Sequence, residues 1–147
     1  MSQKKLHEEI IARSEADEWE EARDEWTLHD IWMSDEPQTC LCGHHPIHEI
    51  CVIRNRENGV YTDVGNWCVN NFLGINSEQL FSSLRKVLVD AGASFNEATI
   101  ELAHDKEIVN DWERRFYLSI WRKRSLTGKQ REKKLQINQK LLKRFTK

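Results

Sequence analysis

All four cysteines of the chain lie in one segment, at spacings that suit a metal site. Cys40 and Cys42 are separated by one residue and followed by Gly43, which lets the backbone turn tightly so that amide groups can point toward the sulfur atoms. Cys51 and Cys68 follow further along the chain. Thiolates are preferred ligands of zinc, and four of them close the tetrahedral shell of a structural site. The spacing therefore predicts one zinc ion held by these four cysteines.

The fourth ligand is the least determined part of this predicted site. Cys51 is the first choice, because thiolate suits zinc and no other cysteine remains. On an extended strand Cys51 shares its face with Ile47, whereas His48 points the other way, and only one of these faces can meet the metal. The competing donors are the imidazoles of His44, His45 and His48.

The cysteine cluster favours a structural metal over a disulfide framework or a catalytic centre. The chain starts with a charged amphipathic stretch, which predicts neither a secretory signal nor a membrane span and favours the cytoplasm, where thiols stay reduced. The deaminase signature His-x-Glu followed by Pro-Cys-x-x-Cys does not occur in the required order, and no nucleophile, base and orienting group can be placed together. We therefore expect zinc to stabilise the fold, and we expect no enzymatic activity.

A β-hairpin and a short helix are predicted to position the ligands. Residues 47–54 are rich in β-prone side chains and residues 60–64 form the return strand. Asn58 and Gly59 between them are a hairpin signal, because both residue types tolerate a positive φ. A short helix is expected after the second strand, with Cys68 near its start, where the helix dipole favours a thiolate.

This segment resembles a treble-clef zinc finger, in which a knuckle, a β-hairpin and the start of a helix surround one zinc ion. It is also similar to a pattern in uncharacterised phage and bacterial proteins, where a Cys-x-Cys-Gly knuckle precedes an Ile-rich strand, an Asn-Gly-type turn and a Val-Gly-x-x-Cys helix start. The knuckle has one residue between its cysteines where two are usual, and the helix start offers one cysteine where two ligands are expected. The resemblance implies a zinc scaffold and no activity. The residues that carry it are Cys40-Leu41-Cys42-Gly43, Asn58-Gly59 and Val64-Gly65-Asn66-Trp67-Cys68.

The apolar pattern outside this segment is mainly helical. A first helix with an acidic face is expected to continue as far as Trp26, with Ser14 and Asp17 as a candidate cap. Residues 27–33 are a candidate short strand that leads into an acidic turn. The last helix is expected to begin at Thr127, whose capping-box partner would be Gln130.

These elements predict an α+β protein with three regions. Residues 1–33 would hold the acidic helix and the possible strand, and residues 34–75 the treble-clef-like zinc core of a hairpin and a short helix. Residues 76–147 would form a helical region with a basic tail. The zinc core is thus expected to be embedded in a mainly helical protein.

The net charge of −2 conceals a strong gradient along the chain. Residues 1–39 carry four Lys or Arg against twelve Asp or Glu, whereas residues 122–147 carry eleven basic side chains against one acidic side chain. A basic helical tail of this kind can neutralise nucleic-acid phosphates. We therefore predict a zinc-stabilised, non-catalytic nucleic-acid-binding module. The residues expected to contact nucleic acid are Arg122, Lys123, Arg124, Lys129, Arg131, Lys133 and Lys134.

A protein partner is the alternative hypothesis. The isoelectric point near 6.3 is low for a dedicated nucleic-acid binder. The acidic first helix could instead mask a charged surface, with the basic tail docked on the acidic face of the same protein. This would make the chain a protein-interaction or inhibitor protein of phage or mobile-element origin, with zinc as its scaffold. The salt dependence of binding distinguishes the two hypotheses, because binding to phosphates weakens steeply with ionic strength and binding through an apolar interface does not.

Overall fold

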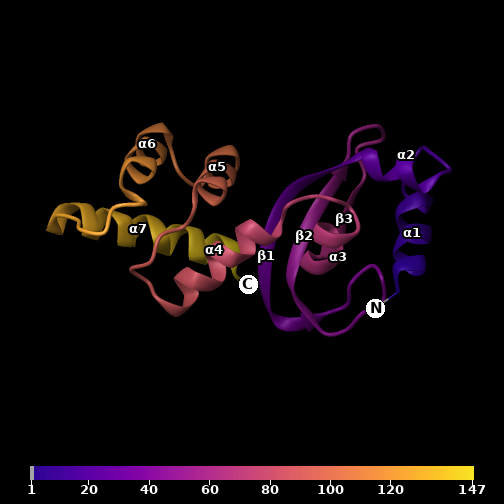
Figure 1. Cartoon of the computed structure of the whole chain (residues 1–147), viewed down its shortest axis with the longest axis horizontal. Helices are drawn as coiled ribbons and strands as arrows, with labels where there is room; N and C mark the ends of the chain where they lie inside the picture. Colours follow the sequence, from indigo (N-terminus) through magenta and orange to yellow (C-terminus); the bar gives the residue numbers. More distant parts are fainter. Residues whose placement is uncertain (1) are drawn as a thin grey trace. The chain divides into compact units, whose positions relative to one another are not determined.

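The computed structural model describes residues 2–147, which form seven helices and one three-stranded sheet. The chain divides into two compact units (Figure 1). Unit 1 comprises the residues up to Glu78 together with Lys147, and unit 2 comprises Gln79–Thr146. The predicted α+β class is confirmed. Within residues 2–147, no helix is both long enough and apolar enough to cross a lipid bilayer.

An antiparallel sheet with the strand order β1-β2-β3 forms the centre of unit 1 (Figure 1). Ile31, Cys51 and Val64 lie opposite one another across the three strands, and all three are fully buried. β-branched and small apolar side chains pack well on such a pleated surface, which explains why this row forms the middle of the sheet. The strands are β1 (Trp26–Gln38), β2 (Ile47–Asn55) and β3 (Tyr61–Gly65).

The first strand is longer than predicted. β1 continues past Met33 through the residues expected to form an acidic turn, and its register against β2 shifts between Met33 and Gln38. The side chain of Ser34 donates a hydrogen bond of 2.6 Å to the carbonyl oxygen of Glu36 in this irregular stretch. A β-bulge accommodates extra residues without ending the strand, so the acidic residues and Pro37 lie at an edge strand, where proline is tolerated.

The predicted hairpin is present, but its loop covers residues 56–60, and of the predicted turn pair only Gly59, not Asn58, has a positive φ. Gly59 has a φ of 75°, a conformation that favours glycine. Asn55 closes the loop, because its side-chain oxygen accepts hydrogen bonds from the backbone N–H groups of Glu57 and Asn58. The loop therefore helps to hold β2 and β3 in register.

The expectation of one long first helix was wrong. The helix ends before Ser14, whose hydroxyl donates to the carbonyl oxygen of Ile10 and accepts a hydrogen bond from the indole of Trp26. The hydroxyl therefore caps the end of a helix and does not begin one with Asp17. The two short helices that replace the predicted one are α1 (Gln3–Ala12) and α2 (Trp19–Asp24).

Unit 2 is helical and closes around large aromatic side chains. Phe81, Phe95 and Tyr117 are fully buried. The Tyr117 hydroxyl donates a hydrogen bond of 2.6 Å to Asn138 and accepts one of 2.9 Å from the Phe95 backbone, so this polar group is satisfied inside the core. The predicted capping box of Thr127 and Gln130 is confirmed. The helices are α4 (Glu78–Val89), α5 (Glu97–Asp105), α6 (Asp111–Ile120) and α7 (Gly128–Phe145).

Glu113 in α6 is a buried carboxylate that connects two helices of unit 2. It accepts a hydrogen bond of 2.6 Å from the Lys140 ammonium on α7 and one of 3.0 Å from the backbone N–H of Asn110. Burial opposes ionisation, but these hydrogen bonds and the charge of Lys140 outweigh it and lower the pKa of Glu113 from 4.5. The ionised carboxylate is thus the form that the folded unit stabilises.

Replacing Glu113 by glutamine should lower the free energy of unfolding by roughly 1–3 kcal/mol at neutral pH, because Lys140 loses its charged partner. The pKa of Glu113 is lower in the folded than in the unfolded protein. Its contribution to the free energy of unfolding is therefore fully present above the unfolded-state pKa and is lost as the pH falls through the folded-state pKa. Urea unfolding at neutral pH and near pH 3 measures this difference. Glu101→Gln, which breaks a half-exposed pair with Arg114, is the control and should cost less than about 1 kcal/mol. An equal loss for Glu113→Gln at both pH values would contradict the assignment.

Candidate metal centre

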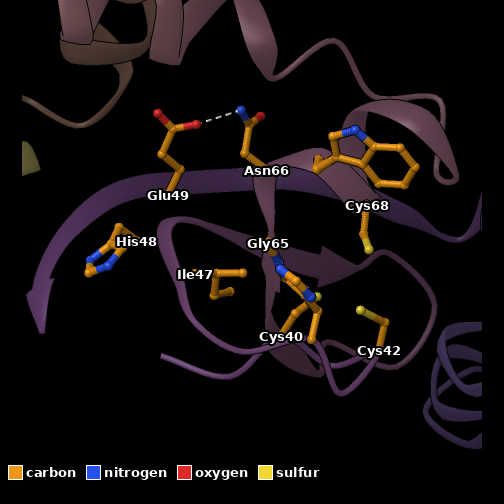
Figure 2. A pocket seen from close by; sticks show the side chains of 10 residues that line it. Cys40, Cys42, Ile47, His48, Glu49, Gly65, Asn66 and Cys68 are labelled. Atoms are coloured by element: carbon orange, nitrogen blue, oxygen red, sulfur yellow. Dashed lines mark hydrogen bonds between the residues drawn. The ribbon is translucent and has the colours of Figure 1, made fainter. Parts of the chain in front are cut away.

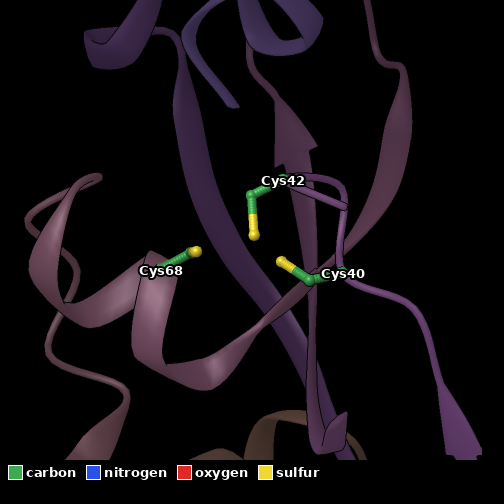
Figure 3. Close-up of side chains that lie close together, drawn as sticks. All are labelled: Cys40, Cys42 and Cys68. Atoms are coloured by element: carbon green, nitrogen blue, oxygen red, sulfur yellow. The ribbon is translucent and has the colours of Figure 1, made fainter. Parts of the chain in front are cut away.

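A tight turn brings Cys40 and Cys42 together. The Cys40 backbone N–H donates a hydrogen bond of 2.9 Å to the carbonyl oxygen of His44, and the Gly43 N–H donates one of 2.8 Å to the carbonyl oxygen of Cys40. Gly43 has a φ of 92°, which a side chain would strain. This is the predicted knuckle, and it places both thiols on the inner side of one turn (Figure 3).

A short helix supplies the third cysteine. α3 (Asn66–Asn71) begins directly after β3, and Cys68 lies in its first turn. Asn66 fixes the start of the helix, because its side-chain amide donates hydrogen bonds of 3.0 Å to both Glu49 and Glu78 and its oxygen accepts one from Ser77. Cys68 is therefore held by a buried polar network that joins the helix to β2.

The sulfur atoms of Cys40, Cys42 and Cys68 all lie within 4.8 Å of one another. Each of the three residues is at most 4% exposed, and Figure 3 shows their side chains pointing toward a common centre. Tetrahedral zinc with bonds of about 2.3 Å needs sulfur atoms about 3.8 Å apart, which this arrangement approaches. The three cysteines could hold a metal ion.

The surroundings of the cluster stabilise negative charge on Cys40. The thiol of Cys68 donates a hydrogen bond to its sulfur, and the backbone N–H groups of Cys42 and Gly65 add two more, the latter at 3.3 Å. These donors outweigh the effect of burial and lower the pKa of Cys40 to about 5. The hydrogen bond between the two thiols raises the pKa of its donor, Cys68. The Lys5 ammonium lies beside Gly43 and adds a positive charge near the knuckle.

Cys51, the first choice for the fourth ligand, is not brought into this group. It is fully buried in the middle of β2, where its thiol forms a hydrogen bond with Ser77. Burial raises the pKa of Cys51 to about 12, which disfavours the thiolate that zinc would need. Cys51 lies in the middle of β2, opposite Ile31 and Val64, whereas the clustered cysteines come from the turn before β2 and from the helix after β3.

The three nearby histidines differ in what they contact. The Nδ1 atom of His45 lies 2.9 Å from the Thr39 hydroxyl, and that of His48 lies 2.9 Å from the carbonyl oxygen of Ser34. His44 and His48 line a pocket of about 300 Å³ that also contains the three clustered cysteines, whereas His45 is not among the residues that line it (Figure 2).

The basic residues predicted to bind nucleic acid fall into two groups within unit 2. Lys123, Arg124, Arg131 and Lys134 line one pocket of about 280 Å³. The others do not line it. Lys129 is exposed near the start of α7, the Arg122 guanidinium lies 4.6 Å from the centre of the Trp121 ring, and Lys133 contacts Trp112 and Glu113.

Two contributors to these sites gave no signal in the sequence. Asn66 acts through hydrogen bonds to Glu49 and Glu78. Gly92, which is distant in sequence from the cations of the unit 2 pocket, also lines that pocket.

Comparison with known proteins gives no match to a family model, a curated protein or a solved structure. A function for this chain can therefore be inferred only from its own residues.

Proposed function

We propose that the chain is a zinc-stabilised nucleic-acid-binding module without catalytic activity. Zinc is the metal that suits buried thiolates, because Mg²⁺ and Ca²⁺ require oxygen ligands. The knuckle, the hairpin and the helix start that carry the cysteines support a treble-clef-like arrangement of unit 1. The role of the zinc ion in this proposal is to stabilise that unit.

The observation that carries nucleic-acid binding is the cationic pocket of unit 2. Four basic side chains line it, and no acidic residue does. Lys123, Arg124 and Arg131 are exposed, and none of them forms an ion pair with another residue of the range 2–147. Cations without a protein partner are available for phosphate oxygens, which arginine binds in a bidentate manner.

Lys134 lines this pocket and is only 7% exposed. Its ammonium donates one hydrogen bond of 2.8 Å to the carbonyl oxygen of Gly92, which leaves further N–H donors for a ligand. Burial lowers the pKa of Lys134, while the charge of nearby Asp90 acts in the opposite direction. A phosphate in the pocket would compensate the cost of burying this ammonium, which supports an anionic ligand.

Binding of the zinc-loaded protein to labelled duplex DNA and to single-stranded RNA across a salt series tests the proposal. The affinity should fall steeply with salt, with a logarithmic slope of about −0.9 per phosphate contact on duplex DNA and about −0.7 on single strands. Four contacts therefore predict a slope of roughly −3 to −4. No binding at low salt, or binding that salt does not weaken, would refute nucleic-acid recognition and favour a protein partner.

A further inference from the structure

A structural zinc ion in this cluster needs one more ligand. Structural sites are almost always four-coordinate and closed by protein groups, whereas three protein ligands with an open position are typical of catalytic zinc. Cys40, Cys42 and Cys68 account for three positions. The fourth donor must come from a residue that lines the same pocket, because the metal would lie among the three sulfur atoms (Figure 2).

Three other donors lie near the cluster. Cys51 is buried in the middle of β2, where Ser77 contacts its thiol, and His45 does not line the pocket. His48 lines it, and the contact of its Nδ1 atom with the Ser34 carbonyl oxygen orients the ring and leaves Nε2 open, so His48 is the competing imidazole.

Glu49 also lines the pocket, but its carboxylate accepts a hydrogen bond of 3.0 Å from Asn66. This bond anchors the helix that carries Cys68. The carboxylate thus already supports the helix start that carries Cys68, and sulfur or imidazole donors suit a structural zinc site better than a carboxylate oxygen. Glu49 is therefore better suited to support the centre than to join it.

His44 differs from these residues because it is part of the turn that carries two of the cysteines. Its carbonyl oxygen accepts the hydrogen bond from the Cys40 N–H that closes the knuckle, so its backbone is fixed on the turn that carries two ligands. Its side chain lines the pocket, is exposed, and forms no hydrogen bond with another residue of the range 2–147. The imidazole nitrogens are not among the donor atoms that lie within 4.8 Å of one another, so binding requires a rotation of this side chain toward the sulfur atoms. An imidazole without a protein partner is free to bind zinc through either nitrogen atom.

We propose that His44 is the fourth ligand and that the site is a Cys₃His zinc centre, an inference that rests on the proposed metal site. The ligands then follow the pattern Cys-x-Cys-x-His on one turn, with Cys68 added from the helix. Three thiolates and a neutral imidazole leave one net negative charge around Zn²⁺. The Lys5 ammonium beside Gly43 lies where it can offset that charge.

The test compares His44→Ala with His45→Ala, a matched control one residue away that removes the same group. Each protein is titrated with Co²⁺, whose visible bands report ligand type and whose near-ultraviolet sulfur-to-metal absorption reports bound thiolates. Zinc affinity is measured against a chromophoric chelator. We expect His44→Ala to weaken zinc by more than about 100-fold, since loss of outer-shell groups alone costs 10–100-fold. His45→Ala should match the unsubstituted protein.

A rescue variant separates ligation from a general effect on folding. His44→Cys should restore tight zinc binding and increase the sulfur-to-cobalt absorption, because a fourth thiolate replaces the imidazole. If His44→Ala keeps the affinity and the visible bands of the unsubstituted protein, His44 is not a ligand, and the same holds if His45→Ala or His48→Ala loses zinc instead. If the unsubstituted protein binds neither metal, the metal centre itself is refuted.

Discussion

Replacing Cys68 by serine is expected to abolish stoichiometric zinc binding and to unfold much of unit 1. Serine is nearly isosteric but its hydroxyl is a poor zinc ligand, and the sulfur atom it removes lies within 4.8 Å of both knuckle sulfurs. Zinc binding supplies roughly 10–16 kcal/mol in small zinc-binding peptides, which is as large as the net stability of about 5–15 kcal/mol of a typical domain. Loss of one ligand therefore removes a decisive part of the folding free energy.

Elemental analysis of purified protein measures the zinc content, and hydrogen exchange of the amides in β2, β3 and α3 measures the local stability. Cys51→Ser is the control, because Cys51 is buried in the sheet but lies outside the cluster. The Cys51→Ser protein should keep one zinc ion per chain. It should lose some stability, because a polar hydroxyl replaces a buried thiol. A full zinc equivalent in Cys68→Ser, or loss of zinc in Cys51→Ser alone, would show that the cluster is assigned to the wrong residues.

The double substitution Lys123→Ala and Arg131→Ala is expected to weaken nucleic-acid binding more than any equivalent change elsewhere in unit 2. Both side chains line the cationic pocket and are exposed, so their removal should leave the core intact. Two lost phosphate contacts should reduce the slope of the salt dependence on duplex DNA by about 1.8. At low salt the affinity should fall by about 10-fold or more, because each charge-assisted hydrogen bond contributes on the order of 1 kcal/mol.

The matched control removes two positive charges from residues of unit 2 that do not line the pocket. Lys129→Ala combined with Lys143→Ala also deletes two exposed cations, and neither residue lines that pocket. Filter binding or fluorescence anisotropy at several salt concentrations compares the two double variants. If the two double variants weaken binding equally, nucleic-acid binding depends on net charge alone and the pocket is not a specific binding site. Thermal unfolding of both proteins confirms that the comparison is between folded molecules.

The knuckle and the last helix could be predicted because their signals are local. Cys40, Cys42 and Gly43 lie within one turn, and the spacing of two thiols around a tight bend is visible in four consecutive residues. The same holds for Thr127 and Gln130, whose reciprocal hydrogen bonds depend on three residues of separation. Such elements depend on residues that are neighbours in the chain, so they can be predicted from the sequence.

The length of β1 and the end of α1 could not be predicted, because distant partners decide them. Between Met33 and Gln38 the pairing with β2 is interrupted, and the extended stretch is instead held by backbone hydrogen bonds with Lys147, although its composition is typical of a turn. Ser14 ends the helix because Trp26 reaches back to its hydroxyl. Local propensity competes here with contacts made by residues far along the chain, and the tertiary contacts win.

By itself the sequence determined the α+β class, the presence of residues that could bind a metal ion, and the concentration of positive charge near the end of the chain. Only the tertiary structure decided which donors meet and which cations share a pocket. Cys51 offers the same thiol as the others, yet it is buried in β2 outside the cluster, whereas the start of α3 places Cys68 within it. A residue type fixes what a side chain can bind, but long-range strand pairing and helix packing fix where it lies.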